Sequence, residues 1–328
     1  MKNEYLKIAI SKEDFISQIF LFFAVSFLGI FLFAVNREIG NIFSWETIVL
    51  VTSIVALAIS YHQKTIFTLA AGLVGISIWI VTKMSNWLVV DEIKIKSAAI
   101  IAVLALLSVI FYLFGRLHEA KSLFKRFSLV YLVFGILPIT AVLLFFSSRP
   151  GIGTIGEMTQ GDPIFSSWQV TVTILLLAIA FIGLLFYTKS KQLISNSEAV
   201  ALVFLVVLLE SKIFLPEQIV SIGASNELYF YGQEQLSNLG VIWAIIYNFV
   251  IFFQLLGLIL LGYVRRESWL INIGAVFLFI LIFIKYFDWF FTFLDKSVFF
   301  IIAGVLLFGL GWFMERGRRY VVSNIEQK

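Results

Sequence analysis

Long apolar runs separated by short polar segments dominate the pattern of hydrophobic and polar positions along this chain. A helix needs roughly 20 apolar residues to cross the hydrocarbon core of a bilayer. Ten runs approach this length, and we predict a transmembrane helix for each. They cover residues 15–35, 45–61, 65–82, 97–115, 128–146, 168–187, 198–215, 239–263, 269–290 and 297–314. The predicted fold class is therefore an all-α integral membrane protein, a bundle of about ten transmembrane helices.

The runs are not equally well defined. Only His62, Gln63 and Lys64 separate the second run from the third, which predicts a tight helical hairpin. Glu210 interrupts the seventh run, which has the weakest apolar pattern of the ten.

The distribution of Lys and Arg predicts the orientation of the bundle, because loops rich in these residues stay in the cytoplasm. With the N-terminus inside, the inside segments hold 16 of the 24 Lys and Arg residues, and the outside segments hold seven. Lys285 lies within the ninth run. This bias predicts that the N-terminus and the C-terminus are both cytoplasmic, and it favours an even number of spans.

Composition agrees with a lipid environment. Hydrophobic residues make up 61% of the chain and charged residues 13%, whereas soluble proteins carry about 25% charged residues. The absence of Cys excludes disulfides, thiolate catalysis and Cys-ligated metal centres. The net charge of +4 lies in the loops, so it indicates orientation and gives no support to nucleic-acid binding.

No shift in composition marks a domain boundary, and we interpret residues 1–328 as a single polytopic membrane domain. Five predicted spans lie on each side of the loop 147–167, so the second half would be inverted relative to the first. Inverted halves are typical of many transporters. The two halves share no similarity at the level of residues, so the arrangement is a reason to consider a transporter and no more.

Ionisable groups inside spans are the strongest candidates for function, because they are costly there. Glu210 and Lys285 fall at similar depth in the predicted outer half of the bilayer, and Asp288 follows Lys285 by one helical turn. One hypothesis is a charged cluster of Glu210, Lys285 and Asp288 that relays protons or substrate. The alternative is that Lys285 reaches the surface and Glu210 pairs with Lys212 or tilts outward.

Two amides, Asn248 and Gln254, lie in the middle of the eighth predicted span. Either side chain could line a polar pathway through the bundle. Interhelical hydrogen bonds are the commoner use of such amides, so packing is the favoured interpretation.

No metal site or cofactor is predicted. The two histidines, His62 and His118, belong to different predicted hairpins and lack the spacing of a metal motif. The basic segment 116–127 contains interleaved Leu and Phe and is expected to lie on the anionic inner leaflet. Membrane lipids are thus the expected partners, and protein partners are unknown.

The last third of the chain resembles a bacterial family of multi-pass predicted membrane proteins that is defined only as a domain of unknown function. The resemblance is carried by the stretches 285–288 (KYFD), 295–300 (DKSVFF) and 315–319 (ERGRR), with the pair Arg265-Arg266 before the segment 272–274 (NIG). It implies a location in the bacterial inner (cytoplasmic) membrane. It also suggests that residues 286–288 are a feature of the family, and it implies no activity.

Three classes of function follow. The first is a transporter or permease of a small molecule or lipid, favoured by the number of spans and the charges within them. The second is a structural or scaffold membrane protein that assembles with partners, favoured by the absence of catalytic motifs. A membrane-embedded enzyme is the least favoured, because His is scarce and Cys is absent.

Overall fold

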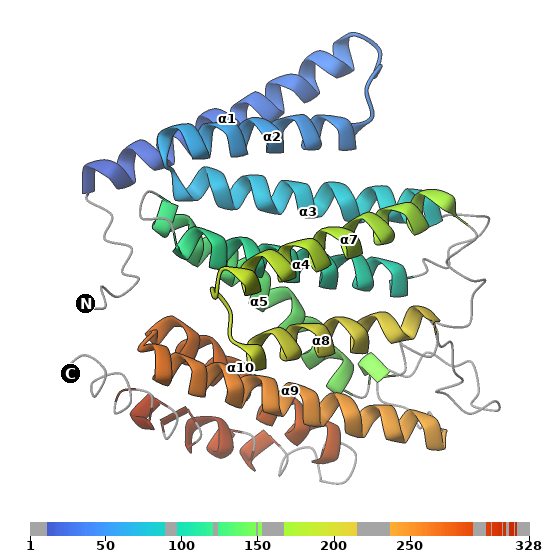
Figure 1. The fold of residues 1–328 in the computed structure, drawn as a ribbon, viewed down its shortest axis with the longest axis vertical. Helices are drawn as coiled ribbons and strands as arrows, with labels where there is room; N and C mark the ends of the chain where they lie inside the picture. Colours follow the sequence, from blue (N-terminus) through green and yellow to red (C-terminus); the bar gives the residue numbers. More distant parts are fainter. Residues whose placement is uncertain are drawn as a thin grey trace. The chain divides into compact units, whose positions relative to one another are not determined.

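In a computed structural model of the protein, the described residues are 12–88, 97–120, 124–148, 150–152, 167–214 and 237–290, together with 300–302, 304–309, 311–312, 315–317 and 319. This part of the chain is helical, with short turns and no strand (Figure 1). The helices are α1 (Lys12–Glu38), α2 (Trp45–Gln63), α3 (Ile66–Leu88), α4 (Ser97–Glu119), α5 (Lys125–Ser147), α7 (Trp168–Ser190), α8 (Asn196–Phe214), α9 (Asn238–Arg265) and α10 (Ser268–Phe290).

Eight of these helices are long and apolar enough to cross a membrane, so the chain is a membrane-embedded, all-helical protein. They are α1, α2, α3, α4, α5, α7, α9 and α10. Each coincides with one of the predicted spans, and the bounds differ by no more than six residues at either end.

The other two predicted spans stay predictions. Helix α8 occupies the seventh range, but it carries Glu198, Glu210 and Lys212 within 19 residues. Glu210 interrupts the apolar stretch of α8, and this helix is not among the eight. The tenth range, 297–314, extends beyond the described residues, although positions 300–302 and 304–309 are helical. The count of about ten and the orientation of the termini are therefore not decided by the helices alone.

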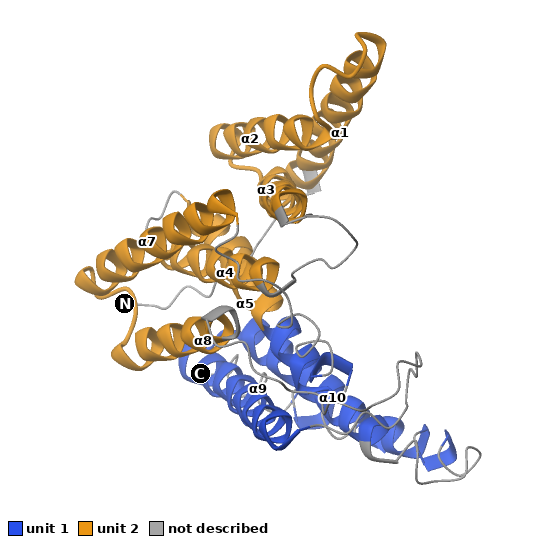
Figure 2. Ribbon diagram, turned by 90° about the vertical axis from the view of Figure 1, so that its right-hand side faces the viewer, with its two compact units in different colours: residues 1–5, 140–160, 217–328 blue, residues 6–139, 161–216 orange. Residues whose placement is uncertain are grey.

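The chain divides into two compact units, which we treat separately (Figure 2). Unit 2 comprises residues 6–139 and 161–216, and so contains α1 to α4, the first part of α5, α7 and α8. Unit 1 comprises residues 1–5, 140–160 and 217–328, and contains the end of α5, α9 and α10.

In unit 2, α2 and α3 form the tight hairpin that the sequence predicts. Helix α2 ends at Gln63, and Lys64 takes the left-handed conformation with a φ of 56° that reverses the chain. Small residues then let the two helices approach closely. A Cβ atom at Gly72 would lie 2.7 Å from the Leu57 side chain, and one at Gly75 would overlap the Ser53 hydroxyl. Gly72 and Gly75 are therefore packing residues of this hairpin.

Helix α4 lies at the centre of unit 2. It packs against α3, α7 and α8. In its apolar stretch 72% of the residues are buried, whereas the corresponding share is 11% in α1 and in α7. The buried side chains around it form one apolar cluster, including Leu69, Leu73, Met84, Val103 and Phe127. A membrane helix that is mostly enclosed by other helices is a place where polar groups can be held by protein partners.

In unit 1, α9 and α10 form a second hairpin. Arg266 turns the chain in the left-handed conformation with a φ of 58°, and the amide of Glu267 donates to the carbonyl of Gly262 at 2.8 Å. A Cβ atom at Gly262 would lie 2.9 Å from the backbone nitrogen of Ile271, and one at Gly274 would lie 3.1 Å from the carbonyl oxygen of Leu255. The two glycines thus set how closely α9 and α10 pack.

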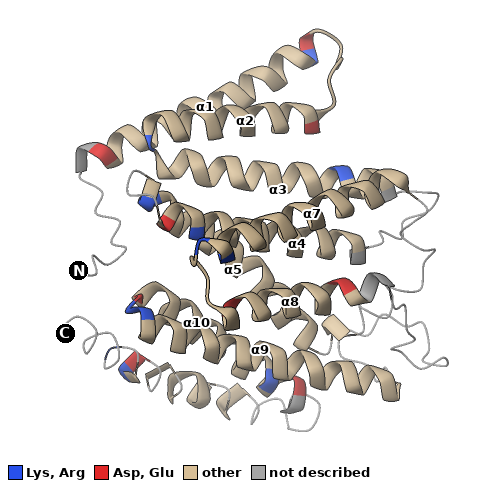
Figure 3. Ribbon diagram, viewed as in Figure 1, with Lys and Arg blue, Asp and Glu red and all other residues tan. Residues whose placement is uncertain are grey.

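Charged side chains concentrate near the helix ends, and most helix centres carry none (Figure 3). This distribution is the one expected for helices in a bilayer, since charge at the centre of the hydrocarbon is costly. The few charged residues inside the helices of each unit are therefore the first place to look for a functional site.

Candidate functional site

Lys285 and Asp288 of the predicted charged cluster lie together on α10. The Lys285 ammonium is 3.2 Å from the Asp288 carboxylate, one helical turn further along. Lys285 also donates a hydrogen bond to the backbone carbonyl of Ser147, the last residue of α5. A cation at a helix C-terminus is stabilised by the helix dipole and by the carbonyl groups that have no partner within the helix. Lys285 thus caps α5 in addition to pairing with Asp288.

The predicted amide of Asn248 converges on the same carbonyl. Asn248 Nδ2 donates to the Ala244 carbonyl at 2.7 Å and to the Ser147 carbonyl at 3.3 Å. We call Ser147, Asn248, Lys285 and Asp288 the unit 1 polar cluster. It ties α9 and α10 to the end of α5.

Gln254 lies elsewhere on α9 and contacts another residue of α5. Its Nε2 donates to the Thr140 hydroxyl at 2.9 Å, whereas its Oε1 is buried without a partner among the described residues. This interhelical hydrogen bond is the packing role that the sequence favours for the amide.

Glu210, the third member of the predicted cluster, belongs to α8 and to unit 2. Both carboxylate oxygens are inaccessible, and neither has a hydrogen-bond partner among the described residues. The outward-tilting alternative needs a carboxylate that reaches the protein surface. In this structure the oxygens of Glu210 are enclosed by protein. A contact of Glu210 with Lys285 stays a prediction, and the side chain of Lys212 lies outside the described part.

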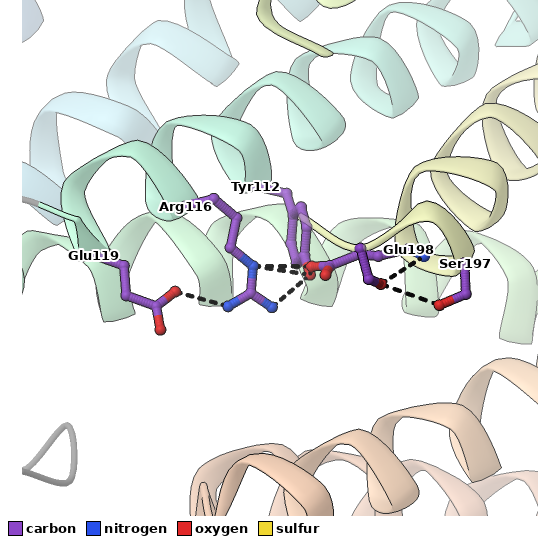
Figure 4. Close-up of polar contacts among 6 residues, drawn as sticks. Tyr112, Arg116, Glu119, Ser197 and Glu198 are labelled. Carbon is purple, nitrogen blue, oxygen red and sulfur yellow. Dashed lines mark hydrogen bonds and ion pairs between the residues drawn. The ribbon is translucent and has the colours of Figure 1, made fainter. Parts of the chain in front are cut away.

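The most extensive ionic network that the structure describes was missed by sequence reasoning. Arg116, near the end of α4, lies between two carboxylates (Figure 4). Its Nε donates to Glu198 at 2.9 Å, and its Nη1 donates to Glu119 at 2.8 Å. Nη2 donates to the Tyr112 hydroxyl at 2.7 Å, and that hydroxyl donates to Glu198. The Arg116 side chain is only 1% exposed. We call Tyr112, Arg116, Glu119 and Glu198 the arginine network.

The local sequence explains how Glu198 reaches Arg116. Ser195 precedes α8 and its hydroxyl accepts a hydrogen bond from the backbone amide of Glu198 at 3.2 Å. A Ser followed three residues later by Glu is the capping-box pattern, in which the Glu side chain would turn back to the amide of the Ser. Here the Glu198 carboxylate accepts from Arg116 and Tyr112 instead. The capping signal was visible in the sequence, but the partner helix was not.

Close packing of α5 fixes the position of Tyr112. A Cβ atom at Gly135 would lie 2.7 Å from the backbone nitrogen of Tyr112, so α5 touches α4 backbone to backbone at this point. The Tyr112 ring is in turn covered by the Arg116 guanidinium, 5.0 Å from the ring centroid. The network is therefore built on rigid, closely packed helices.

This network bears on one residue of the basic segment 116–127, whose location on the inner leaflet stays a prediction. Arg116 does not lie on the leaflet surface, because α4 continues to Glu119 and buries the guanidinium against α8. Two carboxylates compensate its charge within the protein.

A second polar chain joins α2, α4 and α5 in unit 2. The Tyr61 hydroxyl is 2.9 Å from His118 Nε2 and 2.9 Å from the Tyr131 hydroxyl. His118 Nδ1 is 2.7 Å from the Phe114 carbonyl, which can only accept, so Nδ1 carries the proton in the neutral ring. His118 is thus held as a hydrogen-bonded helix residue. No group of three side chains suited to a metal ion occurs among the described residues.

Comparison with known proteins gives no match: neither a family model, nor a curated protein, nor a solved structure is similar to this chain. The resemblance of the last third to a family of bacterial membrane proteins therefore stays a prediction.

Proposed function

We propose that this protein is a permease of a bacterial inner membrane that moves a small molecule or a lipid. The observation that supports the proposal is the burial of charged groups among membrane helices. These are Arg116 with Glu198 in unit 2, Lys285 with Asp288 in unit 1, and Glu210, whose carboxylate has no hydrogen-bond partner among the described residues. Polar groups in this environment are costly, and they commonly mark substrate or ion pathways.

The charge balance of each pair also favours this function. Arg116 and Lys285 are both matched by carboxylates on the same or a neighbouring helix, so neither pair leaves a net positive charge that would need an anionic partner. Glu210 is different, because no described side chain compensates it. A carboxylate of this kind is suited to bind a proton or a cationic group of a passing solute.

Reconstitution tests the proposal. The purified protein would be placed in vesicles, and two probes would be followed: a defined mixture of water-soluble metabolites analysed by mass spectrometry, and a fluorescent phospholipid analogue quenched from outside. We expect transfer of at least one probe above protein-free vesicles, and loss of that transfer in Glu210→Gln and in Lys285→Met. Transfer that is equal in vesicles with and without protein would contradict a permease.

A scaffold role is the second candidate, and the observation in its favour is α1. This helix packs only against α2 and α3 among the described elements with extensive contacts, and its exposed side chains include Phe20, Phe27 and Phe31. Such a face is available to lipid or to a partner helix. In a scaffold, partner binding would persist in Glu210→Gln and Lys285→Met, since neither residue belongs to α1.

A further inference from the structure

The unpartnered carboxylate of Glu210 is the feature of unit 2 that neither packing nor ion pairing explains. Among the described residues, three glutamates have a buried carboxylate oxygen without a hydrogen-bond partner, and Glu210 is the one with both oxygens in that state. Glu46, by comparison, accepts a hydrogen bond from Asn86 through its other oxygen. An ionised carboxylate with no compensation in an apolar environment is strongly disfavoured.

The described helices of unit 2 that pack against α8 bring no compensating charge to the level of Glu210. Helices α4 and α8 run in opposite directions (Figure 1), with Arg116 at the end of α4 beside Glu198 at the start of α8. Glu210 follows Glu198 by twelve residues, or about 18 Å along the helix, and so lies beside the first part of α4. Residues 97–111 of α4 contain no ionisable side chain.

Helix α7, which also packs against α8 in unit 2, is equally apolar along most of its length. Helix α7 precedes α8 through a short turn and packs against it, and residues 168–186 of α7 contain no ionisable side chain. Along α8 itself, the described side chains between Glu198 and Glu210 include no other ionisable group. The Arg116 guanidinium is already held by Glu198 and Glu119 at the far end of the helix.

We infer that Glu210 is a proton-binding site: its carboxyl group carries a proton at neutral pH within the helices of unit 2. Protonation removes the only charge in the central part of α8, leaving Glu198 in the first turn and Lys212 in the last. Helix α8 then meets the requirement that a transmembrane helix keep its charges near its ends. The seventh predicted span and the protonated Glu210 therefore support each other.

In one respect the inference rests on the proposed function. If the protein is a permease, the proton on Glu210 is the coupling ion, since the site can be emptied and refilled without rearranging any ion pair. Binding of the proton itself does not depend on transport, and it can be tested alone.

The experiment is labelling with an apolar carbodiimide, dicyclohexylcarbodiimide, on the full-length protein in membrane vesicles. The acid O–H adds across a C=N bond of the reagent, and the O-acylisourea rearranges to a stable N-acylurea, so only protonated carboxyl groups are marked. Peptide mass spectrometry would compare Glu210 with Glu198, the matched control whose carboxylate is paired with the Arg116 guanidinium. We expect labelling of Glu210 to exceed that of Glu198 by at least about tenfold, to fall as the pH is raised, and to vanish in Glu210→Gln.

Infrared spectroscopy gives an independent readout that does not require reagent access. The carbonyl stretch of a protonated carboxyl group should appear in the infrared spectrum of the wild-type protein. The same band should be missing from the spectrum of Glu210→Gln. If neither the label nor this band appears, the inference is overturned. If both appear but no probe crosses the vesicle membrane, the proton site stands and the permease proposal fails.

Discussion

Removing one partner of the arginine network should destabilise unit 2 far more than removing both. In Glu198→Leu, the Arg116 guanidinium stays buried at 1% exposure but keeps only Glu119, whose side chain is 31% exposed. Breaking a buried pair from one side costs about 3–5 kcal/mol, because an uncompensated charge is left behind. Since Glu119 still neutralises part of the charge, we expect the lower end, about 3 kcal/mol, which shifts the unfolding equilibrium by roughly 100-fold.

The double variant Arg116→Leu/Glu198→Leu removes both charges and leaves apolar side chains of similar reach. Replacing a whole buried ion pair is often neutral or stabilising, so most of the lost stability should return. The Tyr112 hydroxyl, which donates to Glu198, then loses its acceptor, and this leaves a deficit of about 1 kcal/mol.

Unfolding in mixed detergent and denaturant micelles, followed by tryptophan fluorescence, measures these differences. A matched control is Arg126→Leu, which breaks an ion pair with Asp14 at 3.0 Å whose side chains are 50% and 36% exposed. Such a surface pair contributes no more than about 1 kcal/mol. If Glu198→Leu lost no more stability than this control, or if the double variant were less stable than the single one, an uncompensated Arg116 charge would not be the cause of the loss.

Two further predictions concern packing and capping. Gly135→Ala should destabilise the protein by about 1–3 kcal/mol in the same assay, because a Cβ atom would press on the backbone of Tyr112, whereas Gly183→Ala, with nothing within 4 Å, should be neutral or slightly stabilising. Lys285→Met should cost about 1–2 kcal/mol by removing the cation that caps α5, and hydrogen exchange should show the last turn of α5 opening first; uniform protection along α5 would argue against the cap.

Helix positions could be predicted from the sequence because the apolar period and length of a membrane helix are local properties. The hairpin turn at Lys64 was equally local, since three polar residues leave room for one reversal only. The proximity of Lys285 and Asp288 followed from helix geometry, because a spacing of three places them on one face.

The arginine network could not be predicted in this way. Arg116 and Glu198 are 82 residues apart, and each has a local explanation: one sits in a basic segment and the other completes a capping pattern. Which helices pack together is decided by close contacts such as that of Gly135 with Tyr112, and a single glycine in an apolar run does not reveal its partner. The same limit applies to the chain of Tyr61, His118 and Tyr131, which joins three helices.

These contacts explain why the few polar residues matter so much for this fold. Apolar side chains in lipid gain little from choosing one helix neighbour over another, because the lipid tails are equally apolar. Specific pairing must therefore come from close backbone approach and from polar groups that need a partner. The ion pair of Arg116 with Glu198 holds α4 against α8. The hydrogen bond from Lys285 to the Ser147 carbonyl holds α10 against the end of α5. Glu210 alone among these charged residues joins no helix to another in the described part of the chain. The position of Glu210 inside α8 thus has no structural explanation of the kind that accounts for the other charged residues. A substitution at Glu210 is therefore the one expected to change function without weakening the fold.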